Sequence, residues 1–377
     1  MVNKNRFDKL LQRYSNIARN QSYFTTVTCR ELSLEERDGR IIKTSDGRSL
    51  VDFINCSYLG LEIHPSVLQG AIELSTKWGV YFSASRLRAR IDALDELDSN
   101  LSEIFCSYSP VTFSNLTSCH IGVLPLIGSG IVPKIKFRGS PCFIIDKSAH
   151  STLQLCRDTL ANFGSVERIS FDLSELIESR CKKIAESGST PFLICDGVGS
   201  MGGITSIRTL LTIIDKHEGY LYVDDAHGIS SIGKKGAGYV LDALSYIRHP
   251  RVIIAGSLSK GFGAFGGFVG FPFEESAQFV KQNCITYTFS GPLPIPSVGA
   301  ALASSKLHID NSIEVLQIKL NENIKYFDSL FPLQINPNYG SPSPIRLLIT
   351  RRLREIQSQS VRTLFDGHFI ELPPCVA

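Results

Sequence analysis

From about residue 65 onward, short apolar runs alternate with amphipathic stretches along the chain. The apolar runs, rich in Val, Ile and Phe, predict strands at "SPVTF", "PCFIID", "VERISF", "PFLICDGV", "YLYVDDA", "RVIIAGS" and "GGFVGF". Between them, helices are predicted from about 117, from about 150, over "DLSELIESRCKKIAE" and through "LLTIID". Continuous apolar strands that alternate with helices are typical of a mainly parallel sheet covered on both faces. The pattern therefore predicts an α/β fold.

The two ends of the chain carry different patterns. Residues 4–19 have apolar side chains at helical spacing, and residues 31–53 place two DGR turns between alternating segments, which predicts a hairpin. A long helical stretch covers about 295–331 and is followed by a short β-α-β pattern, "SPIRLLIT", "RRLREIQSQSVRTLF" and "GHFIEL". Because this last segment is too small for a core of its own, we expect it to join the hairpin in a small domain. The predicted division is residues 1–50 as the N-terminal part of that small domain, 51–293 as the large domain and 294–377 as the C-terminal part.

Composition narrows the class of protein. The chain has 377 residues, of which 43% are hydrophobic and 20% charged, with a net charge of +3, and it lacks the basic cluster that a nucleic-acid surface needs. No apolar run approaches the ~18 residues that span a bilayer, and the N-terminus lacks the apolar region of a signal peptide. The ten cysteines are scattered without a CxxC pair, which indicates a reducing compartment. We expect a cytoplasmic protein with neither nucleic acid nor membrane as a partner.

One lysine stands in an otherwise apolar run, "AGSLSKGFGAFGGFVGF", at residues 255–271. A buried lysine is costly unless it is paired, neutralised or chemically used. Lys260 could therefore be a loop lysine that points to water, or a lysine that forms a Schiff base. The residues that follow the other predicted strands distinguish a solvent-exposed lysine from a reactive one.

Polar side chains follow the predicted strands where ligands bind in open α/β sheets, at the carboxyl ends. They are His150 after "PCFIID", Ser200 after "PFLICDGV", Asp224, Asp225 and His227 at the end of "YLYV", Ser257 and Lys260 after "RVIIAG", and Thr117 after "SPVTF", where it follows Leu116. Singly, each has a plain structural alternative: a helix cap for the aspartates, a core position for the histidines, a turn for the serine.

Together these residues match the needs of pyridoxal phosphate. A carboxylate keeps its pyridine nitrogen protonated, one imidazole bonds the ring oxygen and another stacks on the ring, and a lysine forms the imine. Hydroxyls and amides at a helix start can hold the phosphate. A metal site is not indicated, because no further ligand cluster stands at metal spacing. A dinucleotide site is not indicated either, because the glycine-rich segment follows the last strands instead of the first.

The segments "CSYLGL", "DKSAHSTL", "DGVGSMGG", "YVDDAHG", "SLSKGFGAFGGFVG" and "YTFSGPLP" occur in the order and approximate spacing of the α-oxoamine synthase family. From about residue 45 to its end the chain resembles this family of fold-type I pyridoxal-phosphate enzymes. Members include 8-amino-7-oxononanoate synthase, 2-amino-3-ketobutyrate CoA ligase, serine palmitoyltransferase and quorum-sensing α-aminoketone autoinducer synthases. The resemblance implies a large sheet domain with a small α+β domain, and a homodimer with its site at the subunit interface. It also implies a C-acyltransferase that condenses an amino acid with an acyl-CoA to an α-aminoketone.

The resemblance also implies a role for each residue. Lys260 would form the Schiff base, Asp224 would pair with the pyridine nitrogen, His227 would hold the ring oxygen and His150 would stack on the ring, which makes these four the catalytic set. Ser200 would lie near the ring oxygen, Ser257 near the phosphate, and the backbone amides of Leu116 and Thr117 would bind phosphate where the family has a glycine and an aromatic residue.

The chain departs from the family pattern in ways that favour a specialised synthase of the autoinducer type. Cys56 replaces an Asn near the substrate, and the sequence stops at "IELPPCVA", before the arginine that binds the substrate carboxylate. We therefore expect an incomplete small domain and weak amino-acid binding, with Arg86 as the best substitute cation. An aminotransferase, or a cofactor-binding homologue with little catalysis, are the alternatives.

Overall fold

The computed structural model of this chain describes residues 15, 33–53, 55–331, 333, 336–346 and 369–371. The chain divides into two compact units, one formed by residues 1–55 with 349–377 and the other by residues 56–348. The predicted helix over 4–19 lies outside the described residues, except for position 15. The helix predicted at "RRLREIQSQSVRTLF" also lies outside them. None of the helices within the described ranges has the length and apolar character that a membrane crossing requires.

The smaller unit contains an antiparallel sheet in the order β1-β2-β3-β11. Its strands are β1 (Leu34–Asp38), β2 (Ile41–Thr44), β3 (Ser49–Asp52) and β11 (Phe369–Glu371). The two DGR turns place Gly39 and Gly47 at φ values of 57° and 83°, a conformation that glycine adopts without strain. The predicted hairpin is confirmed, and the strand in "GHFIEL" pairs with β3.

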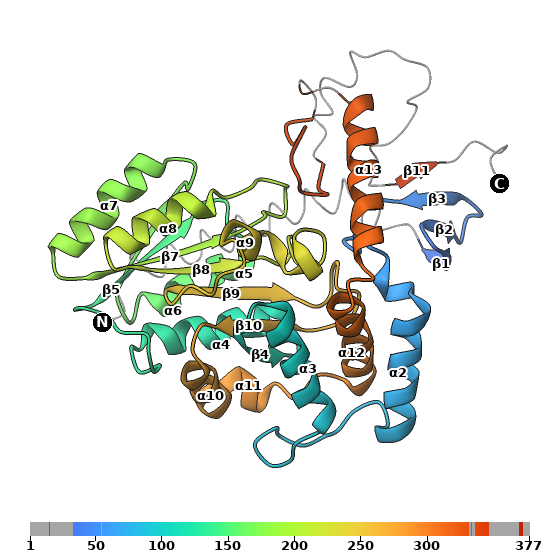
Figure 1. Cartoon of the computed structure of the whole chain (residues 1–377), viewed down its shortest axis with the longest axis horizontal. Helices are drawn as coiled ribbons and strands as arrows, with labels where there is room; N and C mark the ends of the chain where they lie inside the picture. The colour runs from blue at the N-terminus through green and yellow to red at the C-terminus, as the bar shows by residue number, and fades with distance from the viewer. Residues whose placement is uncertain are drawn as a thin grey trace. The chain divides into compact units, whose positions relative to one another are not determined.

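The larger unit is built on a seven-stranded sheet in the order β4-β10-β9-β8-β7-β5-β6 (Figure 1). Its strands are β4 (Ser109–Phe113), β5 (Pro141–Asp146), β6 (Ser165–Ile169), β7 (Thr190–Asp196), β8 (Tyr220–Asp224), β9 (Val252–Ser257) and β10 (Gly267–Phe271). Only β10 runs antiparallel to its neighbours, β4 and β9. The mainly parallel sheet predicted from the apolar runs is confirmed.

Helices cover both faces of this sheet. The helices of the larger unit within the described residues are η1 (Leu61–Ile63), α2 (Pro65–Trp78), α3 (Asp92–Ile104), α4 (Leu116–Gly128), α5 (Ser151–Leu155), α6 (Arg157–Leu160), α7 (Ser174–Glu186), α8 (Ile207–Lys216), η2 (Lys234–Gly236), α9 (Gly238–Ala243), α10 (Glu274–Asn283), α11 (Ile285–Phe289), α12 (Ile295–Ile309) and α13 (Glu314–Leu330). Successive strand residues point to opposite faces, so Ile144 packs with α7 and α8 while Phe143 packs with α4. Two hydrophobic cores, one on each side, hold the strand ends in place.

Two predicted helices are divided in the structure. The stretch near 150 forms the separate short helices α5 and α6, and the stretch over 295–331 breaks between α12 and α13. At that break Asn311 has a φ of 65°, in the left-handed region, which no continuous α-helix contains. Helix α12 packs against α2 and α3, within the larger unit. The described residues of "SPIRLLIT", 343–346, contain no strand.

Candidate active site

A cavity of about 170 Å³ lies at the carboxyl ends of the strands in the larger unit. Its lining residues are Leu116, Thr117, His150, Thr152, Asp196, Val198, Asp224, His227, Ser257 and Lys260. The structure therefore brings seven of the eight predicted site residues to one cavity, although they come from segments up to 144 positions apart in the chain, Leu116 to Lys260.

Ser200 is the predicted residue that the structure does not bring to this cavity. It is exposed, in a turn closed by the bridge between Val198 and Ile204, and Gly202 has a left-handed φ of 84°. The serine and glycines thus form a turn, the plainer of the two interpretations. The side chain that reaches the cavity from this segment is Val198, two positions earlier.

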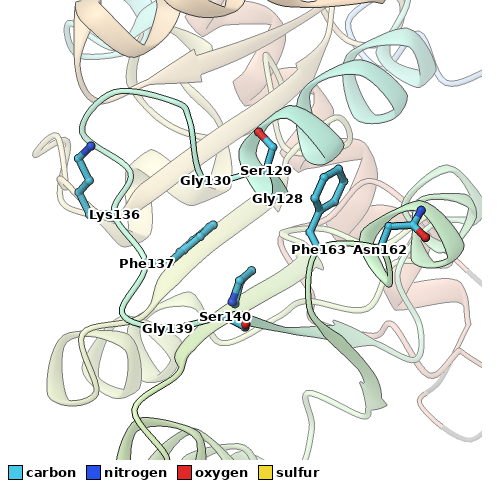
Figure 2. A pocket seen from close by; sticks show the side chains of 10 residues that line it. Gly128, Ser129, Gly130, Lys136, Phe137, Gly139, Ser140, Asn162 and Phe163 are labelled. Atoms are coloured by element: carbon cyan, nitrogen blue, oxygen red, sulfur yellow. The ribbon is translucent and has the colours of Figure 1, made fainter.

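A larger hollow of about 430 Å³ lies elsewhere on the same unit (Figure 2). It includes Pro141, the first residue of β5, so it lies at the amino end of that strand. Phe137 and Phe163 contribute rings to it, and Lys136 is the one titratable residue that lines it. It offers neither a carboxylate nor an imidazole. The smaller cavity is therefore the candidate active site, because it holds the reactive groups.

Lys260 faces an imidazole inside the cavity. Its Nζ lies 2.6 Å from Nε2 of His227, and Nδ1 of the same ring lies 2.6 Å from the hydroxyl of Tyr58. Tyr58 belongs to the "CSYLGL" segment and was not singled out in the sequence. The side chain of Lys260 is half-buried and engaged, which favours the reactive interpretation over a lysine that points to water.

Burial changes the protonation of this pair. Burial, with a further contribution from the Lys260 charge, lowers the pKa of His227 to about 3, so this imidazole is neutral at physiological pH. Burial likewise lowers the pKa of the Lys260 amine, although Asp224 acts in the opposite direction. A lysine with a lowered pKa has more of the neutral amine that attacks a carbonyl carbon. The ammonium can donate to the neutral Nε2, which leaves Nδ1–H to donate to Tyr58.

Asp224 and Asp225 are adjacent but face different surroundings. Asp224 lines the cavity, and its Oδ1 accepts a hydrogen bond from the Ala226 amide at 2.9 Å. Asp225 is fully buried, and its Oδ2 accepts from the amide of Val240 on α9 at 2.9 Å. Burial raises the pKa of Asp225 well above its ordinary value. The carboxylate available to a ligand is therefore that of Asp224, as the sequence predicts.

Burial acts to raise the pKa of Asp224, but its partners outweigh this effect and hold the pKa below its ordinary value. The first partner is His120, whose Nε2 lies 3.1 Å from Oδ2 of Asp224. The charge of Lys260 and the Ala226 amide act in the same direction. His120 lies on α4, 104 positions away in sequence, and no local signal in the sequence pointed to it.

A second carboxyl group, Asp196, also lines the cavity. It ends β7 and stands in register with Asp224 on the neighbouring strand β8. Its Oδ2 accepts from the backbone amide of His150 at 3.0 Å, whereas its buried Oδ1 has no hydrogen-bond partner among the described residues. Burial, together with the charge of Asp224, raises the pKa of Asp196. The sequence motif "DGVGSMGG" contains this residue, but the prediction placed the contact at Ser200.

His150 enters the cavity as the residue that caps α5. Its Nδ1 lies 2.8 Å from Oγ1 of Thr152, which also lines the cavity. Burial lowers the pKa of this imidazole, so it too is neutral at physiological pH. A neutral, half-buried imidazole has a flat face available for stacking on an aromatic ring.

The N-terminus of α4 contributes backbone amides. Asn115 caps the helix by accepting from the Ser118 amide at 2.9 Å, while Leu116 and Thr117, the first two helical residues, line the cavity. N–H groups in the first turn have no acceptor within the helix and favour an anion. The backbone of Leu116 lies so close to Gly267 that a Cβ there would stand 2.6 Å from the Leu116 nitrogen. Glycine at position 267 therefore permits the close approach between β10 and the start of α4.

Two further residues from the sequence analysis lie outside the cavity lining. Arg86 donates from Nη2 to Oγ1 of Thr112 at 2.9 Å and from Nη1 to the Thr112 carbonyl, and its guanidinium lies 4.3 Å from the centre of the Tyr287 ring. The guanidinium of Arg86 is thus bonded to residues inside the larger unit. Cys56 is exposed. Neither residue is among those that line the cavity.

The side chains present fit pyridoxal phosphate. The cavity combines a half-buried lysine amine, an ionised carboxylate held by two hydrogen bonds, two neutral imidazoles and the amino end of a helix. Lys260 would bind the aldehyde carbon, Asp224 the pyridine nitrogen, His227 the ring oxygen and the first turn of α4 the phosphate. The orphaned Oδ1 of Asp196 shows that the cavity retains unused hydrogen-bonding capacity.

The known proteins that this chain resembles agree with a pyridoxal-phosphate enzyme. Residues 161–339 match the family described as aminotransferase class I and II. The chain is 29% identical over 286 residues to an 8-amino-7-oxononanoate synthase of Thermoanaerobacter pseudethanolicus, covering 75% of this chain and 68% of that protein. It is 25% identical over 343 residues to a serine palmitoyltransferase of Bacteriovorax stolpii, covering 89% and 76%. The solved structure of Sphingomonas wittichii serine palmitoyltransferase has the same fold, with a TM-score of 0.70 at 20% identity over 84% of this chain and 76% of that one.

Proposed function

Because this chain is a pyridoxal-phosphate enzyme with an aminotransferase class I and II domain and is a homologue of the α-oxoamine synthases, we propose that it joins an amino acid to an acyl-CoA. The reaction would form a carbon–carbon bond between the α-carbon of the amino acid and the acyl carbonyl. The α-carbon loses its proton or, as CO2, its carboxylate; the carbon–sulfur bond of the thioester breaks, CoA takes up a proton and leaves as the free thiol, and an α-aminoketone results. The observation that carries this proposal is the lysine amine opposite a neutral imidazole, in one cavity with an ionised carboxylate.

Bound pyridoxal phosphate supplies a reactive aldehyde and an electron-accepting ring. Asp224 would hold the positive charge of the ring nitrogen, because its ionised form is stabilised inside the protein. With the cofactor bound, Tyr58 would donate to Nδ1 of His227, so that Nε2, the nitrogen that contacts Lys260 in this structure, would carry the proton and donate it to the ring oxygen. Lys260, released when the substrate amine binds, would then stand beside the α-carbon as the group that accepts and returns its proton. The amides of Leu116 and Thr117 would hold the phosphate.

We further propose a homodimer, with the segments around "TFSGPLP" at the interface. Large apolar side chains are exposed there and in the loop after α2, with Phe289 at 80%, Ile285 at 71% and Val80 at 72%. Exposed apolar side chains of this size are typical of a surface that another protein covers.

The free cysteines within the described residues agree with a reducing compartment such as the cytoplasm. The departures at Cys56 and at Leu116–Thr117 favour a specialised synthase of the autoinducer type.

The test is a panel of amino acids and acyl-CoAs scored by release of free CoA. In parallel, borohydride reduction of the cofactor-loaded protein followed by mass spectrometry should place the adduct on Lys260, and Lys260→Ala should abolish both the adduct and CoA release. Transfer of the amino group to a 2-oxo acid without any CoA release would replace this proposal with an aminotransferase. Cofactor binding without turnover of either kind would identify a binding homologue, and an adduct on another lysine would overturn the site.

A further inference from the structure

Behind the cavity, a chain of buried polar groups ends on the carboxylate that faces the ligand. His120 on α4 and Tyr222 on β8 are both completely buried. Neither lines the cavity, so neither can touch a ligand there. We propose that His120, itself oriented by Tyr222, is a positioning residue that keeps Asp224 ionised and aimed at the cofactor's ring nitrogen. This inference rests on the proposed function.

The hydrogen bonds fix the direction of the chain. Burial raises the pKa of Tyr222 well above its ordinary value, so its hydroxyl keeps its proton and can donate. This hydroxyl lies 2.9 Å from Nδ1 of His120, and Nε2 of the same ring lies 3.1 Å from Oδ2 of Asp224. With Tyr222 donating to Nδ1, the proton of the imidazole must stand on Nε2, where it is donated to Asp224. Tyr222 therefore selects the tautomer that Asp224 needs.

The arrangement leaves one part of the carboxylate free. Oδ2 accepts from His120, and Oδ1 accepts from the Ala226 amide on the chain that follows the strand. Each carboxylate oxygen has two lone pairs, so further acceptor capacity remains on the side that lines the cavity. Without His120, Oδ2 would be a buried charged atom without its donor, and the neutral acid would be favoured.

The position of His120 on α4 links it to the part of the cavity that the start of this helix lines. Leu116 and Thr117 stand one helical turn earlier, at i−4 and i−3, on the same face of the helix. The same rigid helix thus presents amides to the cavity at its N-terminus and a hydrogen-bond donor to Asp224 one turn later. The other titratable groups that interact with Tyr222 or Asp224 include Cys119, Cys156, Cys284, His150, Asp196, Asp225, His227 and Lys260.

A histidine could also be buried for packing alone, and the chain contains such a case for comparison. His308 on α12 is completely buried and bonded to the hydroxyl of Ser230 and the carbonyl of Ser304, yet it does not line the cavity. Substitution of His308 tests the loss of a buried histidine without touching Asp224. Substitution of His120 tests the proposed role, because His120 contacts the carboxylate of Asp224, whereas the hydrogen bonds of His308 are with serine residues.

The experiment measures the protonation of the cofactor itself. Pyridoxal phosphate labelled with ¹⁵N in the ring is bound to the full-length parent, His120→Asn, His120→Leu, Tyr222→Phe and His308→Asn, and the ¹⁵N chemical shift reports whether the ring nitrogen carries a proton. We expect a protonated ring in the parent and in His308→Asn, and loss of that proton in His120→Leu. His120→Asn can still donate to Asp224 through its amide, so it should recover most of the parent signal. Tyr222→Phe should be intermediate, because the imidazole is no longer held in one tautomer.

Cofactor affinity gives a second measurement. We expect His120→Leu to weaken binding about tenfold or more, the usual consequence of losing a hydrogen bond to a charged group. A protonated ring in His120→Leu, or the same change in His308→Asn as in His120→Leu, would overturn the positioning role. If the parent itself fails to bind pyridoxal phosphate, the proposed function fails instead, so the two failures are distinct. If His120→Leu does not fold, His120→Asn and Tyr222→Phe still decide the matter.

Discussion

Gly267 and Gly270 lie on the same strand, β10, and offer a matched pair of substitutions. In both cases glycine is replaced by alanine in a buried position of the same sheet. At Gly267 the added Cβ would stand 2.6 Å from the nitrogen and 2.7 Å from the Cα of Leu116. At Gly270 the nearest atom would be Cβ of Tyr108 at 3.2 Å, and the next lies at 3.6 Å.

The magnitude follows from these distances. Nonbonded carbon atoms normally stand about 3.5–4.0 Å apart, so the Gly267→Ala methyl must displace the start of α4 by roughly 0.5 Å or more. Such overpacking costs about 1–3 kcal/mol. Gly270→Ala needs a shift of only a few tenths of an ångström at Tyr108. Alanine at position 270 also restricts the unfolded chain, which stabilises the folded state by about 0.4–1 kcal/mol and offsets the cost of this small shift. The net change in unfolding free energy for Gly270→Ala should therefore be close to zero.

The displaced backbone at Leu116 and Thr117 is the part of the cavity that we assign to the phosphate. Gly267→Ala should therefore lower pyridoxal-phosphate affinity about tenfold, because amide contacts to a charged group are worth roughly 1.5–3 kcal/mol. Gly270→Ala should bind the cofactor like the parent. The assays are urea unfolding of the cofactor-free protein and titration of pyridoxal phosphate by absorbance.

Two results would refute this reasoning. If Gly267→Ala is as stable as the parent, the close approach seen between β10 and α4 is absent in solution. If Gly267→Ala is destabilised but binds the cofactor normally, the approach is structural and the phosphate lies elsewhere. Inorganic phosphate used as a competing ligand separates a local loss at the anion site from a general weakening of the cavity.

The other substitutions concern the carboxyl groups. Asp224→Asn should retain the cofactor but slow α-proton exchange of a bound amino acid by orders of magnitude. In Asp225→Asn the α-proton should exchange at the parent rate. The exchange is measured by NMR, and an equal loss of rate in both variants would contradict the assignment. Asp196 has a raised pKa in the folded protein, so folding holds a proton that the unfolded chain releases, and stability contributed by this group falls as pH rises above about 4. Asp196→Asn should therefore flatten the decline in unfolding free energy between about pH 5 and pH 8, as measured by urea unfolding of the cofactor-free protein at several pH values. An unchanged slope in this variant would show that Asp196 is ionised in the folded state.

Local patterns along the chain were enough to predict the strands of the large sheet, the turns and the order of the strand ends. Runs such as "PCFIID" and "PFLICDGV" predict buried strands because neighbouring residues impose that preference locally. The two DGR turns form as predicted because glycine adopts positive φ without strain. Since parallel strands end at one edge of a sheet, residues that follow strands could be expected to meet, and Lys260, Asp224 and His227 do meet.

The contacts that each side chain makes depend on long-range packing, so the structure was needed to identify them. Asp224 ends β8 and Asp225 follows it directly, and only the packing of α9 shows that the carboxyl group of Asp225 is bonded inside the protein. Ser200 fits the motif but lies in an exposed turn, while Asp196 reaches the cavity because β7 and β8 are in register. The contact between His120 and Asp224 spans 104 positions, and the local pattern of apolar and polar residues does not predict contacts between residues so far apart. It forms because the long-range packing of α4 against the sheet places the two side chains within hydrogen-bond distance.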